Sequence, residues 1–116
     1  MEGYTDLKGD KGCLKKVLLA GNGAKAVDGK KCIVHYTGTF PDGKVFDSSV
    51  QRGTPFEFVL GAKQVIKGWD EGVASMVQGE KAHFILNPDY AYGPRGAGGV
   101  IPPNATLHFE VEFIKQ

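Results

Sequence analysis

The sequence predicts a β-rich fold in which one short helix lies against the apolar face of an antiparallel sheet. Apolar and polar residues alternate over most patterned segments, which is the period of a strand. Residues 65–76 instead repeat with the period of a helix. Seventeen glycines and six prolines in 116 residues indicate many tight turns. Most connections are too short for parallel crossovers, so antiparallel pairing is expected.

The composition favours one soluble globular domain. The chain is 41% hydrophobic and 23% charged, with a net charge of +1, so it carries no global attraction to nucleic acid or to anionic membranes. No stretch approaches the roughly 20 apolar residues of a membrane helix, and the N-terminus has no signal-peptide core. We therefore expect a cytoplasmic protein, with the nucleus left open, that has neither a nucleic-acid nor a membrane partner.

Residues 1–12 lack apolar periodicity and predict a flexible N-terminal arm, so the folded domain is expected over residues 13–116. A turn follows from Pro41-Asp42-Gly43, where proline presets φ, aspartate bonds its own backbone and glycine takes a positive φ. The strands are expected at residues 13–19, 31–39, 44–47, 55–60, 81–86 and 107–113.

The helix is predicted because four apolar residues of the stretch 65–76 fall at i, i+3, i+7 and i+10, on one side of a 3.6-residue period. They are Ile66, Trp69, Val73 and Met76. The acidic pair Asp70-Glu71 near its start suits the helix macrodipole, so we interpret these carboxylates as structural rather than catalytic.

A long irregular stretch, residues 87–104, is rich in proline and glycine. Loops of this length in small domains are usually functional or disordered. Its aromatic and aliphatic members favour function; they are Tyr90, Tyr92, Val100 and Ile101.

Signals for metal or covalent chemistry are weak. The three histidines, His35, His83 and His108, fall within predicted strands and lack the spacing of a zinc site, so no metal or cofactor is expected. Cys13 and Cys32 are too few for a disulfide framework, and free buried thiols in a reducing compartment are preferred to a bridge. A metal or acid/base enzyme is the weakest of the functional hypotheses.

Aromatic residues are in surplus. Phe46 stands beside Asp47, and Arg52 follows five residues later. This pattern suggests the rim of a pocket in which Arg52 and a tyrosine hydroxyl hold the carboxylate. A surface ion pair explains the same spacing equally well.

Six blocks in order carry a family signature. They are Val34-His35-Tyr36-Thr37-Gly38, Asp42-Gly43-Lys44-Val45-Phe46-Asp47-Ser48-Ser49, Pro55-Phe56-Glu57-Phe58, Val65-Ile66-Lys67-Gly68-Trp69-Asp70, Tyr90-Ala91-Tyr92-Gly93 and Ile101-Pro102-Pro103-Asn104-Ala105-Thr106-Leu107. Together they resemble the FKBP family of peptidyl-prolyl cis/trans isomerases, whose members bind the macrolides rapamycin and tacrolimus. The resemblance spans about Cys13 to the C-terminus.

The resemblance implies an α+β fold, with an antiparallel sheet of about five strands wrapped around one short α-helix and the site between them. Trp69 would form the pocket floor, and its aromatic walls would be Tyr36, Phe46, Phe56 and Phe109. Val65 and Ile66 would form a rim, with the backbone N–H of Ile66 donating to a bound carbonyl.

The resemblance also assigns the polar side of the site. Asp47 would face the carbonyl region of the ligand, held by Arg52. Tyr92 would offer a hydroxyl donor from the long loop, with Val100 and Ile101 as an apolar lip. The implied catalytic set is Tyr36, Phe46, Asp47, Trp69, Tyr92 and Phe109.

The implied function is isomerisation of X-Pro bonds without a cofactor, by a monomer whose partners are proline-containing polypeptides, rapamycin and tacrolimus. The tip of the loop, residues 95–99, is smaller and richer in glycine than in well-known members, so binding of the macrolide complex to calcineurin is left open. The competing hypothesis is a protein-docking module, one domain of a larger family member, that uses its pocket or the loop 87–104.

Overall fold

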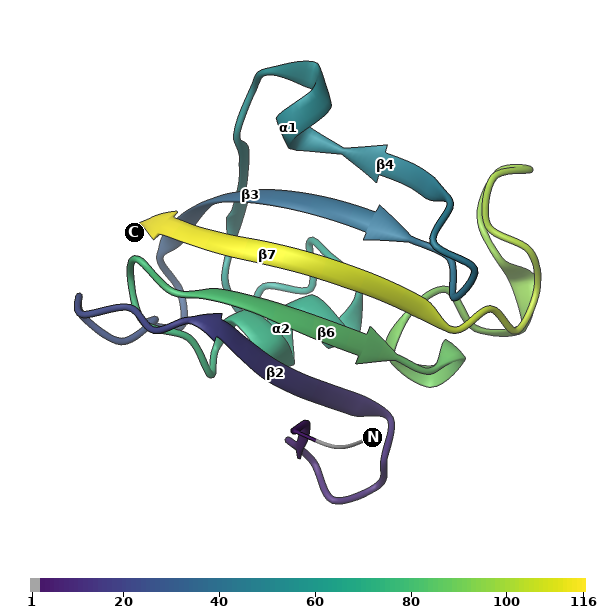
Figure 1. Ribbon diagram of the computed structural model, residues 1–116, viewed down its shortest axis with the longest axis horizontal. Helices are drawn as coiled ribbons and strands as arrows, with labels where there is room; N and C mark the ends of the chain where they lie inside the picture. The colour runs from purple at the N-terminus through teal and green to yellow at the C-terminus, as the bar shows by residue number, and fades with distance from the viewer. Residues whose placement is uncertain (1–2) are drawn as a thin grey trace.

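An antiparallel sheet with helix α2 against one of its faces dominates the structure (Figure 1). It is a computed structural model that describes residues 3–116. The strands are β1 (Thr5–Asp6), β2 (Cys13–Leu19), β3 (Lys31–Thr39), β4 (Val45–Ser48), β5 (Phe56–Val59), β6 (Lys81–Leu86) and β7 (Leu107–Lys115). The helices are α1 (Ser49–Arg52) and α2 (Lys67–Val73), and two 3-10 turns are η1 (Pro88–Tyr90) and η2 (Gly93–Arg95).

The strands follow the order β1-β2-β6-β7-β3-β4, and β5 also pairs with β3. One edge of β3 pairs with β7, while β5 pairs with residues 31–34 and β4 with residues 37–39. The predicted fold class is confirmed. Within residues 3–116 the sheet has seven strands rather than about five, because β1 adds a short edge strand and because β4 and β5 both pair with β3.

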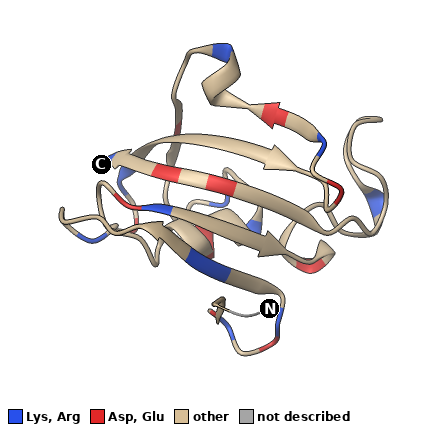
Figure 2. Ribbon diagram, in the orientation of Figure 1, with Lys and Arg blue, Asp and Glu red and all other residues tan. Residues whose placement is uncertain are grey.

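The hydrophobic core lies between the sheet and α2. Alternate residues of β7 are almost completely buried, as the sequence predicts, since Leu107, Phe109, Val111 and Phe113 are at most 3% exposed. Burying each such side chain contributes about 1.5–3 kcal/mol. Charged residues of both signs are interspersed over the ribbon instead of being segregated by sign (Figure 2).

Helix α2 is shorter than the stretch 65–76 but lies within it. It packs closely on β6 because two of its residues lack a side chain. A Cβ on Gly68 would lie 2.4 Å from Leu86 Cδ1, and one on Gly72 would lie 2.8 Å from Phe84 Cε1. The carboxylate of Asp70 accepts hydrogen bonds from two backbone N–H groups of the preceding turn, which supports its predicted structural role.

Helix α1 is one turn that the sequence analysis does not predict. Ser48 caps its start by accepting a hydrogen bond from Gln51 N at 3.2 Å, and Gly53 ends it in the left-handed conformation, with φ of 74°. In Figure 1, α1 lies at the top of the view beyond β4.

The segment predicted to be a flexible arm makes several contacts in its described part. β1 pairs with Leu14 and Lys15 of β2, and the Tyr90 hydroxyl donates to Asp10 at 2.6 Å. Lys8 pairs with Glu71 of α2 at 2.9 Å. Flexibility of this arm stays a prediction, and residues 1–2 lie outside the described residues.

Both cysteines are buried free thiols, as preferred from the sequence. No helix within residues 3–116 is long and apolar enough to cross a membrane.

Candidate active site

A pocket of about 230 Å³ opens between β3, β4 and the start of α2. Its lining residues are Tyr36, Phe46, Asp47, Phe56, Gln64, Val65, Ile66, Trp69, Tyr92 and Phe109. All of the site residues expected from the sequence line this pocket, except Arg52, Val100 and Ile101. The structure therefore brings together residues from six separate parts of the chain.

Trp69 is the buried centre of the aromatic cluster, with only 6% of its surface exposed. Its indole meets three pocket rings nearly at right angles, with centroids at 4.7 Å for Tyr36, 5.7 Å for Phe56 and 5.5 Å for Phe109. Such edge-to-face contacts are the favoured geometry of aromatic pairs. The cluster holds Trp69 in place in the pocket lining, and its role as the pocket floor stays a prediction.

Phe46 extends the aromatic lining of the pocket. Its ring packs edge-to-face on Phe109, with centroids 5.6 Å apart, and is backed by Phe40 at 5.0 Å. Phe40 is a supporting residue that the sequence analysis misses. It stands beside the turn at residues 41–43, and nothing in the sequence there indicates a contact with the site.

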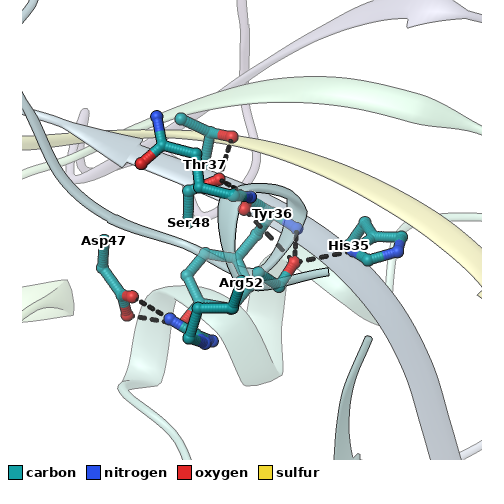
Figure 3. A network of polar contacts seen from close by, with 8 residues as sticks. His35, Tyr36, Thr37, Asp47, Ser48 and Arg52 are labelled. Carbon is teal, nitrogen blue, oxygen red and sulfur yellow. Dashed lines mark hydrogen bonds and ion pairs between the residues drawn. The ribbon is translucent and has the colours of Figure 1, made fainter. Parts of the chain in front are cut away.

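Asp47, on β4 beside Phe46, is the acidic group of the pocket. The Tyr36 hydroxyl donates to Asp47 Oδ2 at 2.5 Å, and the Arg52 guanidinium pairs with Asp47 Oδ1 (Figure 3). Arg52 Nη2 also donates to the Tyr36 hydroxyl at 3.2 Å. The expected contacts of the carboxylate with an arginine and a tyrosine are therefore present, and Arg52 acts from outside the lining.

Burial raises the pKa of Tyr36, and the hydrogen bond to Asp47 raises it further. Burial likewise raises the pKa of Tyr92, followed by the nearby charge of Asp47. Both phenols therefore remain protonated at neutral pH and can donate hydrogen bonds.

The start of α2 supplies the backbone rim of the pocket. Ile66 is the N-cap residue, in extended conformation with φ of −60° and ψ of 153°. Its N–H group therefore lies before the first hydrogen bond of the helix. Donors at this position have no partner within the helix. Val65 and Ile66 are half-buried and line the pocket with their side chains or backbone. This placement suits a donor to a bound carbonyl.

The long loop contributes less than expected. Tyr92 lines the pocket and is 40% exposed. Among the residues that the structure describes, the lining includes neither Val100, which is 58% exposed, nor Ile101, which is buried and bridges to Ala97. The bridge between residues 97 and 101 places these two residues in a turn of their own, and their role as an apolar lip stays a prediction.

Gln64 is a lining residue that the sequence analysis misses. Its Oε1 accepts a hydrogen bond from Val59 N at 2.9 Å, which ties the end of β5 to the segment before α2. Gln64 belongs to no periodic pattern, so only the adjacent Val65 and Ile66 could have drawn attention to it.

Comparisons with known proteins give the family of this chain. The family model of FKBP-type peptidyl-prolyl cis-trans isomerases matches residues 22–114. FK506-binding protein 1 of Dictyostelium discoideum is 58% identical over 98 residues, which cover 84% of this chain and 92% of that protein. A peptidyl-prolyl cis-trans isomerase of Schizosaccharomyces pombe is 53% identical over 104 residues, or 89% of this chain and 93% of that protein.

The fold is similar as well. The crystal structure of AtFKBP13 matches with a TM-score of 0.91 and 36% sequence identity, covering 97% of this chain and 98% of that one. The family model covers most of the chain, and both relatives match it over nearly their whole lengths. This chain therefore belongs to the FKBP family and is a peptidyl-prolyl cis-trans isomerase.

Proposed function

We propose that this isomerase rotates X-Pro bonds inside the aromatic pocket between the sheet and α2, and that rapamycin and tacrolimus bind in the same place. The observation that carries the proposal is Trp69, held by edge-to-face contacts beneath an opening that Asp47 and Tyr92 border. A proline ring fits over this indole, with its two flanking amides at the polar rim.

The reaction needs no nucleophile. The barrier to rotation about an amide bond is roughly 18–20 kcal/mol, and uncatalysed X-Pro isomerisation takes tens to hundreds of seconds. Turnover in milliseconds requires a barrier lower by roughly 5–7 kcal/mol. A twisted amide has lost resonance and is less polar at its C–N bond than the planar ground state. Transfer to a dry aromatic site therefore favours the transition state over the ground state.

Different groups at the rim contact the two sides of the X-Pro bond. The backbone N–H of Ile66 donates to one flanking carbonyl and fixes that side of the peptide. Asp47, held by Tyr36 and Arg52, faces the carbonyl that rotates, and Tyr92 offers a hydroxyl donor nearby. Fixing one side of the bond while the other turns converts binding energy into rotation.

Macrolide binding rests on two further supports. The Dictyostelium relative, 58% identical, is named an FK506-binding protein. A pocket lined by six aromatic residues with a few polar groups is also typical of small-molecule sites.

One titration tests both parts of the proposal. The isomerisation rate of a proline-containing peptide is measured against rapamycin concentration, while Trp69 emission is recorded in the same samples. We expect activity to fall to the uncatalysed rate as the pocket fills, with emission changing in parallel because Trp69 is the only tryptophan. Tight rapamycin binding without turnover in the free protein would refute the proposed catalytic role of this pocket.

A further inference from the structure

Strand β3 has a gap along one edge, next to the pocket. Pairing with β5 ends at Val34, and pairing with β4 begins at Thr37. Between these points the segment that joins β4 to β5 leaves the sheet to form α1, so within residues 3–116 no strand lies against His35 and Tyr36 on this side. Buried backbone N–H and C=O groups require partners. The backbone of Tyr36 must therefore find them elsewhere.

A single side chain fills the gap. Ser49, the first residue of α1, is completely buried. Its hydroxyl accepts a hydrogen bond from Tyr36 N at 2.7 Å and lies 3.3 Å from Tyr36 O, to which it can donate. His35 Nδ1 lies 2.9 Å from the Ser49 hydroxyl oxygen. Figure 3 shows this network around His35 and Tyr36. The serine hydroxyl thus replaces a paired strand.

The position of Tyr36 matters because its side chain reaches the site. The ring lies 4.7 Å from Trp69, and the hydroxyl donates to Asp47. Tyr36 thereby connects the aromatic floor to the acidic rim. A shift of its backbone would move both contacts together, and small misplacements in an active site have large kinetic effects.

We propose that Ser49 is a positioning residue for isomerisation: its hydroxyl fastens the Tyr36 backbone across the gap in the sheet and so keeps the phenol opposite Asp47. This inference rests on the proposed function, in which Tyr36 and Asp47 face the substrate. Ser49 itself is outside the pocket lining and acts only through Tyr36.

The adjacent serine provides a matched control. Ser48 is also buried, but its hydroxyl caps α1 through Gln51 N at 3.2 Å and contacts the Thr37 hydroxyl at 3.0 Å. It therefore stabilises the same helix without bonding the Tyr36 backbone. Ser48→Ala should reduce stability while leaving kcat/KM of the folded protein unchanged.

The test is a double-mutant cycle on kcat/KM, measured on full-length protein well below its unfolding temperature. We expect Tyr36→Phe to lower kcat/KM, and Ser49→Ala to lower it by about ten- to a hundredfold. In the Tyr36→Phe background, Ser49→Ala should lower kcat/KM by about threefold or less, because both changes act through one group. The near-ultraviolet circular dichroism of Trp69 should change with Ser49→Ala and not with Ser48→Ala.

The outcomes separate the two proposals. Equal effects of Ser49→Ala in both backgrounds would overturn the positioning role and leave the proposed function intact. A Tyr36→Phe variant with full activity would overturn both the positioning role and the polar part of the proposed site. Where Ser49→Ala does not fold, Ser49→Cys enters the same cycle, since a thiol keeps the size of the side chain but bonds more weakly. Ser49→Cys should lower kcat/KM in the native background, and by less in the Tyr36→Phe background.

Discussion

Gly38 of β3 lies directly against the ring of Phe46: a Cβ added to this glycine would be 2.6 Å from Phe46 Cζ and 2.9 Å from Phe109 Cε1. Both rings line the pocket. Gly38→Ala should therefore displace them, destabilise the fold by about 1–3 kcal/mol and weaken rapamycin binding. Urea unfolding and Trp69 fluorescence titration measure the two effects. Adding Phe46→Leu should restore part of the stability but not the affinity, and unchanged affinity in Gly38→Ala would contradict the close contact.

The ion pair of Asp47 with Arg52 should serve catalysis more than stability. Their side chains are 40% and 49% exposed, and pairs this exposed contribute about 0–1 kcal/mol to folding. Arg52→Met should thus leave the unfolding midpoint nearly unchanged while it lowers kcat/KM, because the carboxylate loses one of its two anchors. Lys31→Met breaks a more exposed pair, Lys31 with Glu57, outside the pocket lining and should alter neither. Equal kinetic effects of both variants would rule out a specific role for Arg52.

The sheet and helix follow from the sequence because their signals are local. Strict alternation from Leu107 onwards and the 3.6-residue spacing around Trp69 are each set by which side chains meet the core, so period alone reveals them. Helix α1 leaves no such periodic signal because it is a single turn. Its caps, Ser48 and Gly53, are local, but the hydrogen bond from Tyr36 N to the Ser49 hydroxyl, which ties it to β3, spans thirteen positions. A contact of this kind depends on the finished sheet.

The site also has a part that the sequence predicts and a part that it does not. Its aromatic residues belong to family blocks that the sequence displays, and the pairing of Asp47 with Arg52 could be inferred from their spacing. Val100 and Ile101 are not among the lining residues, and the bridge between Ala97 and Ile101 folds the loop back on itself. The side chains of a glycine-rich segment do not specify one backbone conformation, since glycine permits many conformations.

The two cysteines should be unreactive in the folded protein. Burial raises the pKa of Cys13 and of Cys32 to about 11 each, and the thiolate is the reactive form. At pH 8, a disulfide exchange reagent should label neither thiol in native protein and both in guanidinium chloride. Rapid labelling of one thiol without denaturant would show that its site opens readily, and a Cys13→Ala variant identifies which one.

Stability should fall on mild acidification because of two histidines on β6 and β7. Burial, and then the neighbouring His108, lowers the pKa of His83, and burial lowers that of His108, each from 6.5. Below pH 6.5 the unfolded chain therefore binds more protons than the folded one, so the free energy of unfolding decreases as pH falls towards the folded pKa values. Above pH 6.5 the contribution is complete.

Urea unfolding at pH 7.5 and at pH 5.5 checks this sign. A variant with His83→Gln and His108→Gln should lose less stability between the two conditions than the native protein does. An identical loss in the two proteins would assign the pH dependence to other groups. Tyr4, whose hydroxyl lies 2.5 Å from His83 Nδ1, offers an independent check, since Tyr4→Phe should leave the direction of the change intact.

The ion pair of Lys15 with Glu80 should behave differently from that of Asp47 with Arg52, because both of its side chains are less than 10% exposed. Lys15 Nζ lies 2.7 Å from Glu80 Oε2 and donates to Ser75 O at 3.0 Å. Lys15→Met leaves a buried carboxylate without its cation and should destabilise the fold by about 3–5 kcal/mol. The double variant with Glu80→Gln should recover much of this loss, because it removes the stranded charge, and urea unfolding of the two variants measures the difference. Equal destabilisation by the single and double variants would mean that packing of the lysine stem, rather than charge, accounts for the effect.

Isomerase activity per folded molecule should be unaffected in both variants, since neither Lys15 nor Glu80 belongs to the pocket lining.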